Sequence, residues 1–187
     1  EKMVYRFIKR AFDICASLLA ILISSPVWLI IAIGIKLSSK GPVFYRADRI
    51  GKGGKKFVLY KFRSMHVFVT EDKSAGEKRE GGYIANENRI FKFGGILRKT
   101  KLDELPQLLN ILKGDMSIVG PRPERKVIAD EYCKDIPEFA YRLKVRGGLT
   151  GYAQIYGKYN TSAYDKLRLD LMYIENYSLM LDIKLIL

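Results

Sequence analysis

The sequence has a single histidine, His66, and only two cysteines, Cys15 and Cys133, among its 187 residues. One histidine cannot supply a zinc site built on several histidines, and it argues against a serine–histidine–aspartate site, so His66 is predicted to be structural. The two cysteines lie far apart, one in an apolar run and the other in a polar region. No disulfide framework is predicted, and a reducing, cytoplasmic compartment fits this usage.

Acidic residues are also scarce, since 20 Asp and Glu stand against 33 Lys and Arg, for a formal net charge of +13. The apolar content of 48% excludes a disordered chain, and the length suits one domain. Charge is missing altogether from the 22 residues between Ile14 and Ile35. As a helix this run would be about 33 Å long, roughly the hydrocarbon thickness of a bilayer. These features exclude a simple soluble protein.

Pro26 stands in the middle of the uncharged run, directly after Ser24 and Ser25. A kink or break is expected there, because proline lacks an N–H and clashes with the carbonyl four residues back. Basic residues flank the run on both sides: Lys2, Arg6, Lys9 and Arg10 precede it, and Lys36, Lys40, Arg46 and Arg49 follow it. This symmetry favours a re-entrant helix-break-helix with both flanks in the cytoplasm. A kinked spanning helix and a buried helix of a soluble core are the alternatives.

The rest of the chain mixes short strands with helices. Residues 41–65 predict a short β unit in which a Gly-rich turn joins two apolar strands. Residues 70–82 have almost no apolar side chains and predict a loop. Residues 90–101 are amphipathic and basic, a pattern suited to an anionic lipid surface or to phosphates. The predicted fold class is therefore α+β and mainly helical, with a small β-hairpin and amphipathic interfacial helices.

Two further helices are indicated by their end signals. The first is predicted to run from Asp103, as its N-cap, to Gly114, with Pro106 in the first turn, where proline is tolerated. The second is predicted after Ser162, because Ser162-x-x-Asp165 matches a capping box.

The adjacent carboxylates Asp103 and Glu104 follow a stretch, residues 89–101, that holds five basic residues and no acid. The helix end and the nearby cations should favour the ionised form of Asp103. An ionised aspartate can attack phosphorus, and two adjacent carboxylates can share a divalent cation. The alternative is purely structural, since aspartate is a preferred N-cap and Asp–Glu pairs are common on helix surfaces.

Gly120-Pro121-Arg122-Pro123 predicts a rigid turn that presents one guanidinium, which suits bidentate binding of phosphate. A turn with no role beyond structure is the alternative. Other basic residues extend the cationic inventory, although each alone is most often solvated: Lys61, Arg63, Arg142, Lys144 and Arg146.

These signals form one ordered series of motifs. They are Lys9-Arg10-x-Phe12-Asp13, the Ser-Pro break, Gly41-Pro42-Val43-Phe44, Lys61-Phe62-Arg63-Ser64-Met65, Leu97-Arg98-Lys99-Thr100, Leu102-Asp103-Glu104-Leu105-Pro106-Gln107, Asn110-x-Leu112-Lys113-Gly114-Asp115-Met116-Ser117, Val119-Gly120-Pro121-Arg122-Pro123 and Gly148-Leu149-Thr150-Gly151-Tyr152-Ala153-Gln154. Over almost the whole chain the series resembles the bacterial sugar transferases known as monotopic polyprenol-phosphate phosphoglycosyl transferases.

The resemblance implies an enzyme that moves a phospho-sugar from a UDP-sugar to undecaprenyl phosphate, giving undecaprenyl-diphosphate-sugar and UMP. Such a reaction is the first membrane step of capsule, exopolysaccharide or O-antigen assembly. The resemblance also implies that Asp103 is the covalent nucleophile and that Asp103 and Glu104 hold a required Mg²⁺. Positions implied to contact substrate or phosphate are Arg122, Arg98, Lys61, Arg63 and Asp170.

The implied arrangement is a re-entrant membrane hairpin over residues 1–40 and a catalytic domain over residues 41–187. The domain would lie on the cytoplasmic face of the bacterial inner membrane. The chain is expected to be part of a longer protein, because it begins with Glu1 rather than Met and stops inside an apolar run. Nothing in the sequence identifies the sugar, the pathway or the oligomeric state.

Three other functions compete with this prediction. A non-enzymatic, membrane-anchored module that binds anionic lipid would explain the charge, but not an Asp–Glu pair inside the most cationic region. A glycosyl transferase that moves only the sugar would release UDP. A nucleic-acid binder is disfavoured because the aromatic residues are not arranged as a stacking platform.

Overall fold

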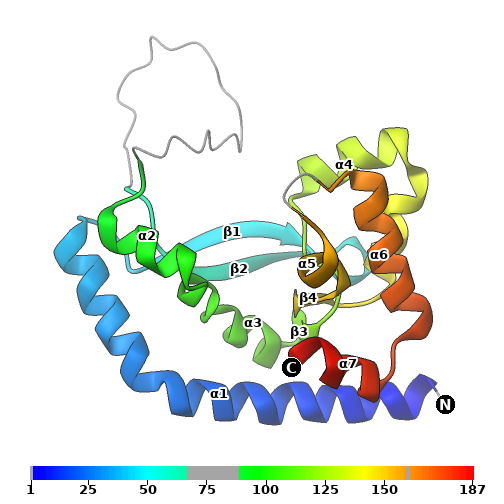
Figure 1. Cartoon of the computed structure of the whole chain (residues 1–187), viewed down its shortest axis with the longest axis horizontal. Coiled ribbons are helices and arrows are strands. Elements are labelled where there is room, and N and C mark those ends of the chain that lie inside the picture. The colour runs from blue at the N-terminus through cyan, green and yellow to red at the C-terminus, as the bar shows by residue number, and fades with distance from the viewer. Residues whose placement is uncertain (1, 67–88, 159–160) are drawn as a thin grey trace. The chain divides into compact units, whose positions relative to one another are not determined.

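The computed structural model describes residues 2–66, 89–158 and 161–187. Figure 1 shows the elements in chain order, and they make a mainly helical α+β fold, which confirms the predicted class. Their bounds are α1 (Lys2–Ser38), β1 (Phe44–Ile50), β2 (Lys56–Phe62), α2 (Lys92–Lys99), α3 (Gln107–Lys113), β3 (Met116–Val119), α4 (Lys126–Asp135), β4 (Gly147–Thr150), α5 (Tyr152–Tyr156), α6 (Ala163–Asn176) and α7 (Leu179–Ile186). The loop predicted at residues 70–82 lies outside the described residues.

The chain forms two compact units. Unit 1 contains Glu1–Ser24, Arg46–Tyr60 and Pro106–Leu187, and unit 2 contains Ser25–Tyr45 and Lys61–Leu105. The elements α1, β1 and β2 each contribute residues to both units. The boundary predicted at residue 40 concerns the membrane arrangement and stays a prediction.

Helix α1 runs from Lys2 to Ser38 as one continuous helix and contains Pro26 in its interior. The hydroxyl of Ser24, two residues before the proline, donates a hydrogen bond of 2.6 Å to the Ala20 carbonyl of the same helix. The outcome is one helix that contains the proline, rather than two helices separated by a break.

Most of the surface of α1 is apolar and exposed. Its buried side chains are few and include Asp13 and Ser17 in unit 1, and Ile31 and Ile35 in unit 2. The span Val4–Ser38 is long and apolar enough to cross a membrane, with a mean hydropathy of 2.5 in its most apolar window and only 11% of that window buried. Helix α1 is therefore not the buried helix of a soluble core, and its surface supports association with a membrane.

The predicted β unit is confirmed, since β1 and β2 pair as a two-stranded sheet joined by a turn at residues 51–55. Gly53 and Gly54 occupy the turn with φ of 70° and 74°, a region that favours glycine. In unit 1, the Asn110 side chain of α3 accepts from the Tyr60 N–H at 3.0 Å and donates to the Val58 carbonyl at 2.7 Å. This side chain fastens α3 to the outer edge of β2.

Unit 1 also holds a parallel pair of strands, β3 and β4, in which Met116 lies opposite Gly147 and Val119 opposite Thr150. A side chain at Gly148 would collide with the backbone of Gly120, so β4 and the residue that follows β3 can approach closely only because both positions are glycine. Helices α5 and α6 pack beside each other in the same unit (Figure 1). Two apolar clusters stabilise this unit, one containing Ile50, Ala129, Phe139 and Leu167 and the other containing Val119, Tyr173 and Leu185.

Asp182 of α7 connects three segments of unit 1 and is almost completely buried. Its carboxylate accepts from Tyr5 Oη at 2.9 Å, Lys9 Nζ at 2.6 Å and Tyr173 Oη at 2.7 Å. Burial and the neighbouring carboxylate raise the pKa of both Tyr5 and Tyr173, so both hydroxyls stay protonated as donors. The start of α1 is thus fixed to α6 and α7 by hydrogen bonds.

The helix ends confirm two predictions and correct a third. Ser162 Oγ accepts from the Asp165 N–H at 3.1 Å, so the predicted cap of α6 is present. Gly114 ends α3 in the left-handed region, with φ of 91°. The predicted N-cap at Asp103 is wrong, because α3 begins only at Gln107, after Pro106.

Unit 2 is built around the second half of α1. Ile31 and Ile35 pack with Phe62, Phe91 and Leu97 in one apolar cluster. A side chain at Gly94 would collide with the Ser64 backbone, so α2 lies close to the chain that follows β2. The amphipathic basic segment predicted at 90–101 therefore forms α2 and buries its apolar side in this unit.

Candidate active site

Asp103 and Glu104 lie on a 3₁₀ turn, Leu102–Glu104, that follows Lys101 in the left-handed region with φ of 61°. Leu102 and Leu105 flank the two carboxylates and both pack against the apolar cluster of unit 2. Residues three positions apart share one side of a 3₁₀ turn, so both leucines reach the same apolar cluster. The turn holds the dyad at the surface of the unit 2 core.

The Asp103 side chain is 8% exposed. Burial is the largest influence on its pKa and raises it, Lys61 opposes that rise, Glu104 adds to it, and Arg98 and Lys101 oppose it more weakly. The sequence predicted the reverse direction, because it assumed a helix N-terminus at this residue and considered only the cations. Desolvation outweighs the cations, so ionised Asp103 is less stable than a solvated carboxylate and hence more reactive.

Lys61, which was predicted to contact substrate or phosphate, lies beside the dyad, and its Nζ contacts Glu104 Oε1 at 2.7 Å with both side chains mostly buried. Arg98 is exposed on α2 and acts on Asp103 by its charge. Among the residues that the structure describes, no hydrogen bond or ion pair occupies the Asp103 carboxylate itself. Glu104 is thus paired with a lysine, while the Asp103 carboxylate has no hydrogen-bond or ion-pair partner among the described residues.

Arg63 was predicted to contact phosphate, and the structure gives that contact no support. Its side chain is buried, and its Nε donates to the Pro42 carbonyl at 2.6 Å. Its Nη1 and Nη2 donate to the hydroxyl and carbonyl of Ser39, both at 2.8 Å. Burial lowers the pKa of this guanidinium. Arg63 closes the end of α1 onto the β unit, which is a structural role.

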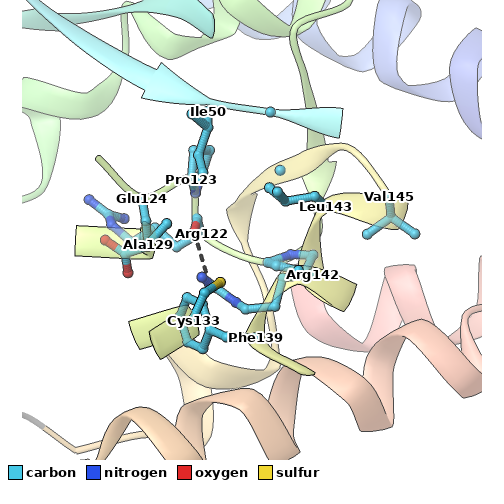
Figure 2. Close-up of a pocket in the computed structure, with 14 residues that line it drawn as sticks. Ile50, Arg122, Pro123, Glu124, Ala129, Cys133, Phe139, Arg142, Leu143 and Val145 are labelled. Carbon is cyan, nitrogen blue, oxygen red and sulfur yellow. Dashed lines mark hydrogen bonds between the residues drawn. The ribbon is translucent and has the colours of Figure 1, made fainter. Parts of the chain in front are cut away.

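The Gly-Pro-Arg-Pro turn lies in unit 1, directly after β3, and two backbone hydrogen bonds and one from a side chain fix it. Gly120 N donates to the Thr150 carbonyl at 2.9 Å, and Gly148 N donates to the Pro121 carbonyl at 2.9 Å. Figure 2 shows the third, in which Arg142 Nη2 donates to the Arg122 carbonyl at 3.0 Å. The rigid turn predicted from the sequence is present, and Arg122 is half-buried at its tip.

Asp170 is linked to the turn through Arg142. It is 1% exposed on α6, and its Oδ2 accepts from Arg142 Nε at 2.6 Å. Burial raises the pKa of Asp170, and the charge and hydrogen bond of Arg142 oppose that rise. The sequence pattern predicts a solvated Arg142, and no local signal marks this residue as buried. Asp170 is thus placed to position Arg142, and Arg142 the carbonyl of Arg122.

The two groups of residues belong to different units: Asp103, Glu104, Lys61, Arg98 and Arg63 to unit 2, and Arg122, Arg142 and Asp170 to unit 1. Within each group the structure brings the predicted residues together, apart from the structural placement of Arg63.

The dyad suits a divalent cation only in company with a ligand. Across residues 2–66, 89–158 and 161–187, no three His, Cys, Asp or Glu side chains gather closely enough to hold a metal ion by themselves. Mg²⁺ in proteins is commonly bound by one or two carboxylates together with water and the phosphates of a substrate. The oxygen chemistry of Asp103 and Glu104 fits that pattern.

Replacing Lys61 by Gln should move the acidic limb of the pH profile of kcat/KM to higher pH. Lys61 is the main charge that lowers the pKa of Asp103, and its removal also takes away the cation that contacts the Glu104 carboxylate beside Asp103. Both changes disfavour ionised Asp103. Lys99→Gln is the matched control, because Lys99 is exposed on α2 and is not among the charges that shift Asp103. An unmoved limb in the Lys61 variant would show that Asp103 does not set the profile.

Comparison of the sequence with known proteins identifies the family of this chain. The chain belongs to the bacterial sugar transferase family, whose model matches residues 4–187. It is 42% identical to the UDP-N-acetylgalactosamine-undecaprenyl-phosphate N-acetylgalactosaminephosphotransferase of Aeromonas hydrophila, over 98% of this chain and 43% of that protein. It is 43% identical to the UDP-glucose:undecaprenyl-phosphate glucose-1-phosphate transferase of Escherichia coli (strain K12), over 98% of this chain and 39% of that protein. The predicted family is confirmed.

The chain spans about two fifths of the length of these two relatives. Shorter relatives are covered more fully, since the exopolysaccharide production protein PSS of Rhizobium leguminosarum bv. phaseoli is 39% identical over 96% of this chain and 91% of that protein. The matched region is thus close to the full length of some family members.

Proposed function

We propose that this chain transfers a phospho-sugar from a UDP-sugar to undecaprenyl phosphate, giving a polyprenyl-diphosphate-sugar and UMP. The observation that carries the proposal is the mostly buried Asp103 carboxylate, which lies beside the Lys61–Glu104 ion pair and has no protein partner in the described part of the chain. The names of the relatives supply the substrate class, which is a UDP-sugar and undecaprenyl phosphate.

The first step uses Asp103 as a nucleophile. A carboxylate oxygen attacks the sugar-bearing phosphorus of the UDP-sugar, an aspartyl-phosphate bond forms, and the bond to the UMP oxygen breaks. Burial favours this step, since the charge of the attacking carboxylate is partly lost as the bond forms. Lys61 and Arg98 stabilise negative charge near the reacting phosphate.

In the second step a phosphate oxygen of the lipid acceptor attacks the same phosphorus. The bond to Asp103 breaks, a diphosphate bond forms, and the Asp103 carboxylate is regenerated. Mg²⁺, held by Asp103, Glu104 and the substrate phosphates, would neutralise the diphosphate and stabilise the leaving group. Arg122 is suited to hold a phosphate oxygen, because its turn is already rigid and little entropy is lost on binding.

The product of turnover tests the proposal directly. With a UDP-sugar, Mg²⁺ and a polyprenol phosphate, the chain should release UMP, and omission of the lipid should limit release to about one UMP per protein molecule. Release of UDP would show that only the sugar is moved. A complete lack of nucleotide release, with binding to anionic vesicles retained, would leave the non-enzymatic lipid-binding module as the better account.

We propose further that α1 is re-entrant and that the catalytic residues lie at the cytoplasmic face of the bacterial inner membrane. The basic residues on both sides of the uncharged run support this arrangement, since neither flank is favoured for export. A lipid acceptor, whose phosphate lies at headgroup level, also requires a site at the membrane surface.

Cysteine labelling in inverted and right-side-out vesicles distinguishes the topologies. In a Cys15→Ser, Cys133→Ser background, Val4→Cys and Arg46→Cys place one thiol on each side of the uncharged run. Both should react with an impermeant reagent only from the cytoplasmic side. Reaction of the two thiols from opposite sides would establish a spanning helix.

A further inference from the structure

Unit 1 contains a cavity of about 320 Å³ that includes none of the predicted site residues. The first turns of α1 form one wall, and residues 144–146, before β4, form another. A volume of this size is typical of ligand sites in proteins. The basic residues around it are Arg6, Lys9, Arg10, Lys52, Lys144 and Arg146.

Two of these basic side chains have partners within the protein. Lys9 pairs with Asp182, and Arg10 donates to the carbonyls of Ile111 at 2.5 Å and Leu112 at 2.7 Å at the end of α3. Among the described residues that line the cavity, one is acidic, Asp13, whose Oδ1 accepts from Ser117 Oγ at 3.1 Å and from the Ile118 N–H at 3.0 Å.

Lys144 Nζ lies over the Tyr141 ring, 4.1 Å from its centroid, so three of the six basic residues remain to be placed. In the part of the chain that the structure describes, no carboxylate pairs with Arg6, Lys52 or Arg146. All three side chains are exposed and line the cavity. The neighbouring Lys9 and Arg10, by contrast, are bonded to Asp182 and to the end of α3. Convergent unpaired cations around a cavity attract an anion, and guanidinium groups are suited to phosphate oxygens.

Apolar side chains border the same cavity. Phe7 lines it and is 77% exposed, and Val4 and Ile8 are exposed on the same turns of α1. Tyr177 lines it as well and leads into α7, where Met180 and Ile186 are exposed. Hydrogen bonds from Tyr5 and Lys9 to Asp182 hold α7 beside the start of α1. The exposed apolar side chains of both helices therefore lie around the same cation-lined cavity. Cations next to unpartnered apolar groups match the interface between headgroups and acyl chains.

We propose that this cavity binds the headgroup of an anionic glycerophospholipid, with its phosphate on Arg6, Lys52 and Arg146 and its acyl chains along the exposed apolar side chains of α1 and α7. The cavity includes none of the residues that the proposed function assigns to the transfer reaction. The proposed binding rests on the membrane association in the proposed function and not on the transfer chemistry.

Binding is measured on the Asp103→Asn variant in neutral detergent, so that turnover plays no part. A short-chain phosphatidylglycerol should bind and raise the thermal unfolding temperature, whereas phosphatidylcholine of the same chain length should not. Arg6→Gln with Arg146→Gln should weaken phosphatidylglycerol binding about thirtyfold, from the usual attraction of a basic residue to an anionic lipid surface. The matched control is Lys126→Gln with Lys134→Gln, which removes the same charge from exposed positions on α4 and should leave the affinity unchanged.

If the cavity double variant does not fold, Lys52→Gln on the turn between β1 and β2 replaces it, with an expected loss of about fivefold. Equal weakening in the cavity and control variants would overturn the proposal in favour of a general electrostatic field. Displacement of phosphatidylglycerol by UDP, by glycerol 3-phosphate or by polyprenol phosphate would overturn it in favour of a nucleotide, a free phosphate or the acceptor. Selective phosphatidylglycerol binding in a chain that releases no UMP would support this site while refuting the proposed function.

Discussion

Asp103→Asn should lower the rate of UMP release by about 10⁴-fold or more and abolish the stoichiometric release seen without lipid acceptor. An amide cannot form the aspartyl-phosphate bond, and losses of this size are usual when a nucleophile is removed. Nucleotide release is measured in single-turnover and steady-state experiments. Turnover close to that of the unchanged chain would refute the assignment of Asp103 as nucleophile.

The same variant should be at least as stable as the unchanged chain, which separates chemistry from folding. Burial raises the pKa of Asp103 above its ordinary value of 3.8. The contribution of this group to stability is therefore fully present below that value and is lost as the pH rises through the folded-state pKa. At neutral pH the ionised, buried carboxylate costs stability, and an asparagine does not carry that cost. Loss of activity together with a large loss of stability would instead indicate a structural residue.

Asp170→Asn should reduce the free energy of unfolding by about 3–5 kcal/mol, because it leaves the buried Arg142 guanidinium without its counter-charge. It should also raise the KM for the UDP-sugar more than it lowers kcat, since Arg142 supports the carbonyl of Arg122 (Figure 2). Chemical unfolding in detergent and steady-state kinetics measure the two effects.

Two comparisons define the role of Asp170. Lys126→Gln breaks an exposed ion pair with Asp130 and should change the stability by less than about 1 kcal/mol. Arg142→Met combined with Asp170→Leu removes both buried charges and should recover much of the stability, without restoring the KM. If the double variant also recovers a normal KM, the pair does not position Arg122.

Local sequence patterns predicted the features that depend on neighbouring residues. The Gly-rich turn between β1 and β2, the Ser162 cap of α6 and the end of α3 at Gly114 all follow from side chains within a few positions of each other. The ion pair between Lys61 and Glu104 was not predicted, since the two residues lie in distant segments and no local pattern connects them.

The features that were missed depend on distant partners. The helix expected from Asp103 begins only at Gln107, and the dyad lies on a 3₁₀ turn whose Leu102 and Leu105 both pack against the apolar cluster that contains Ile31 and Ile35 of α1. Arg63 and Arg142 were taken for phosphate-binding or solvated residues, yet both are buried. Their acceptors, at Ser39, Pro42 and Asp170, are more than twenty positions away along the chain. No window of sequence around either arginine contains that information.

The narrow buried stripe of α1 has a thermodynamic consequence. Side chains such as Leu22, Ile23, Leu29 and Ile30 are mostly exposed in the folded chain, so folding by itself does not remove them from solvent. Their transfer free energy is realised only when hydrocarbon surrounds them. The reference state for any unfolding experiment is therefore a chain still dissolved in lipid or detergent, and the measured stability will depend on the amphiphile chosen. The free energy of unfolding therefore belongs to the polypeptide together with the lipid or detergent around α1.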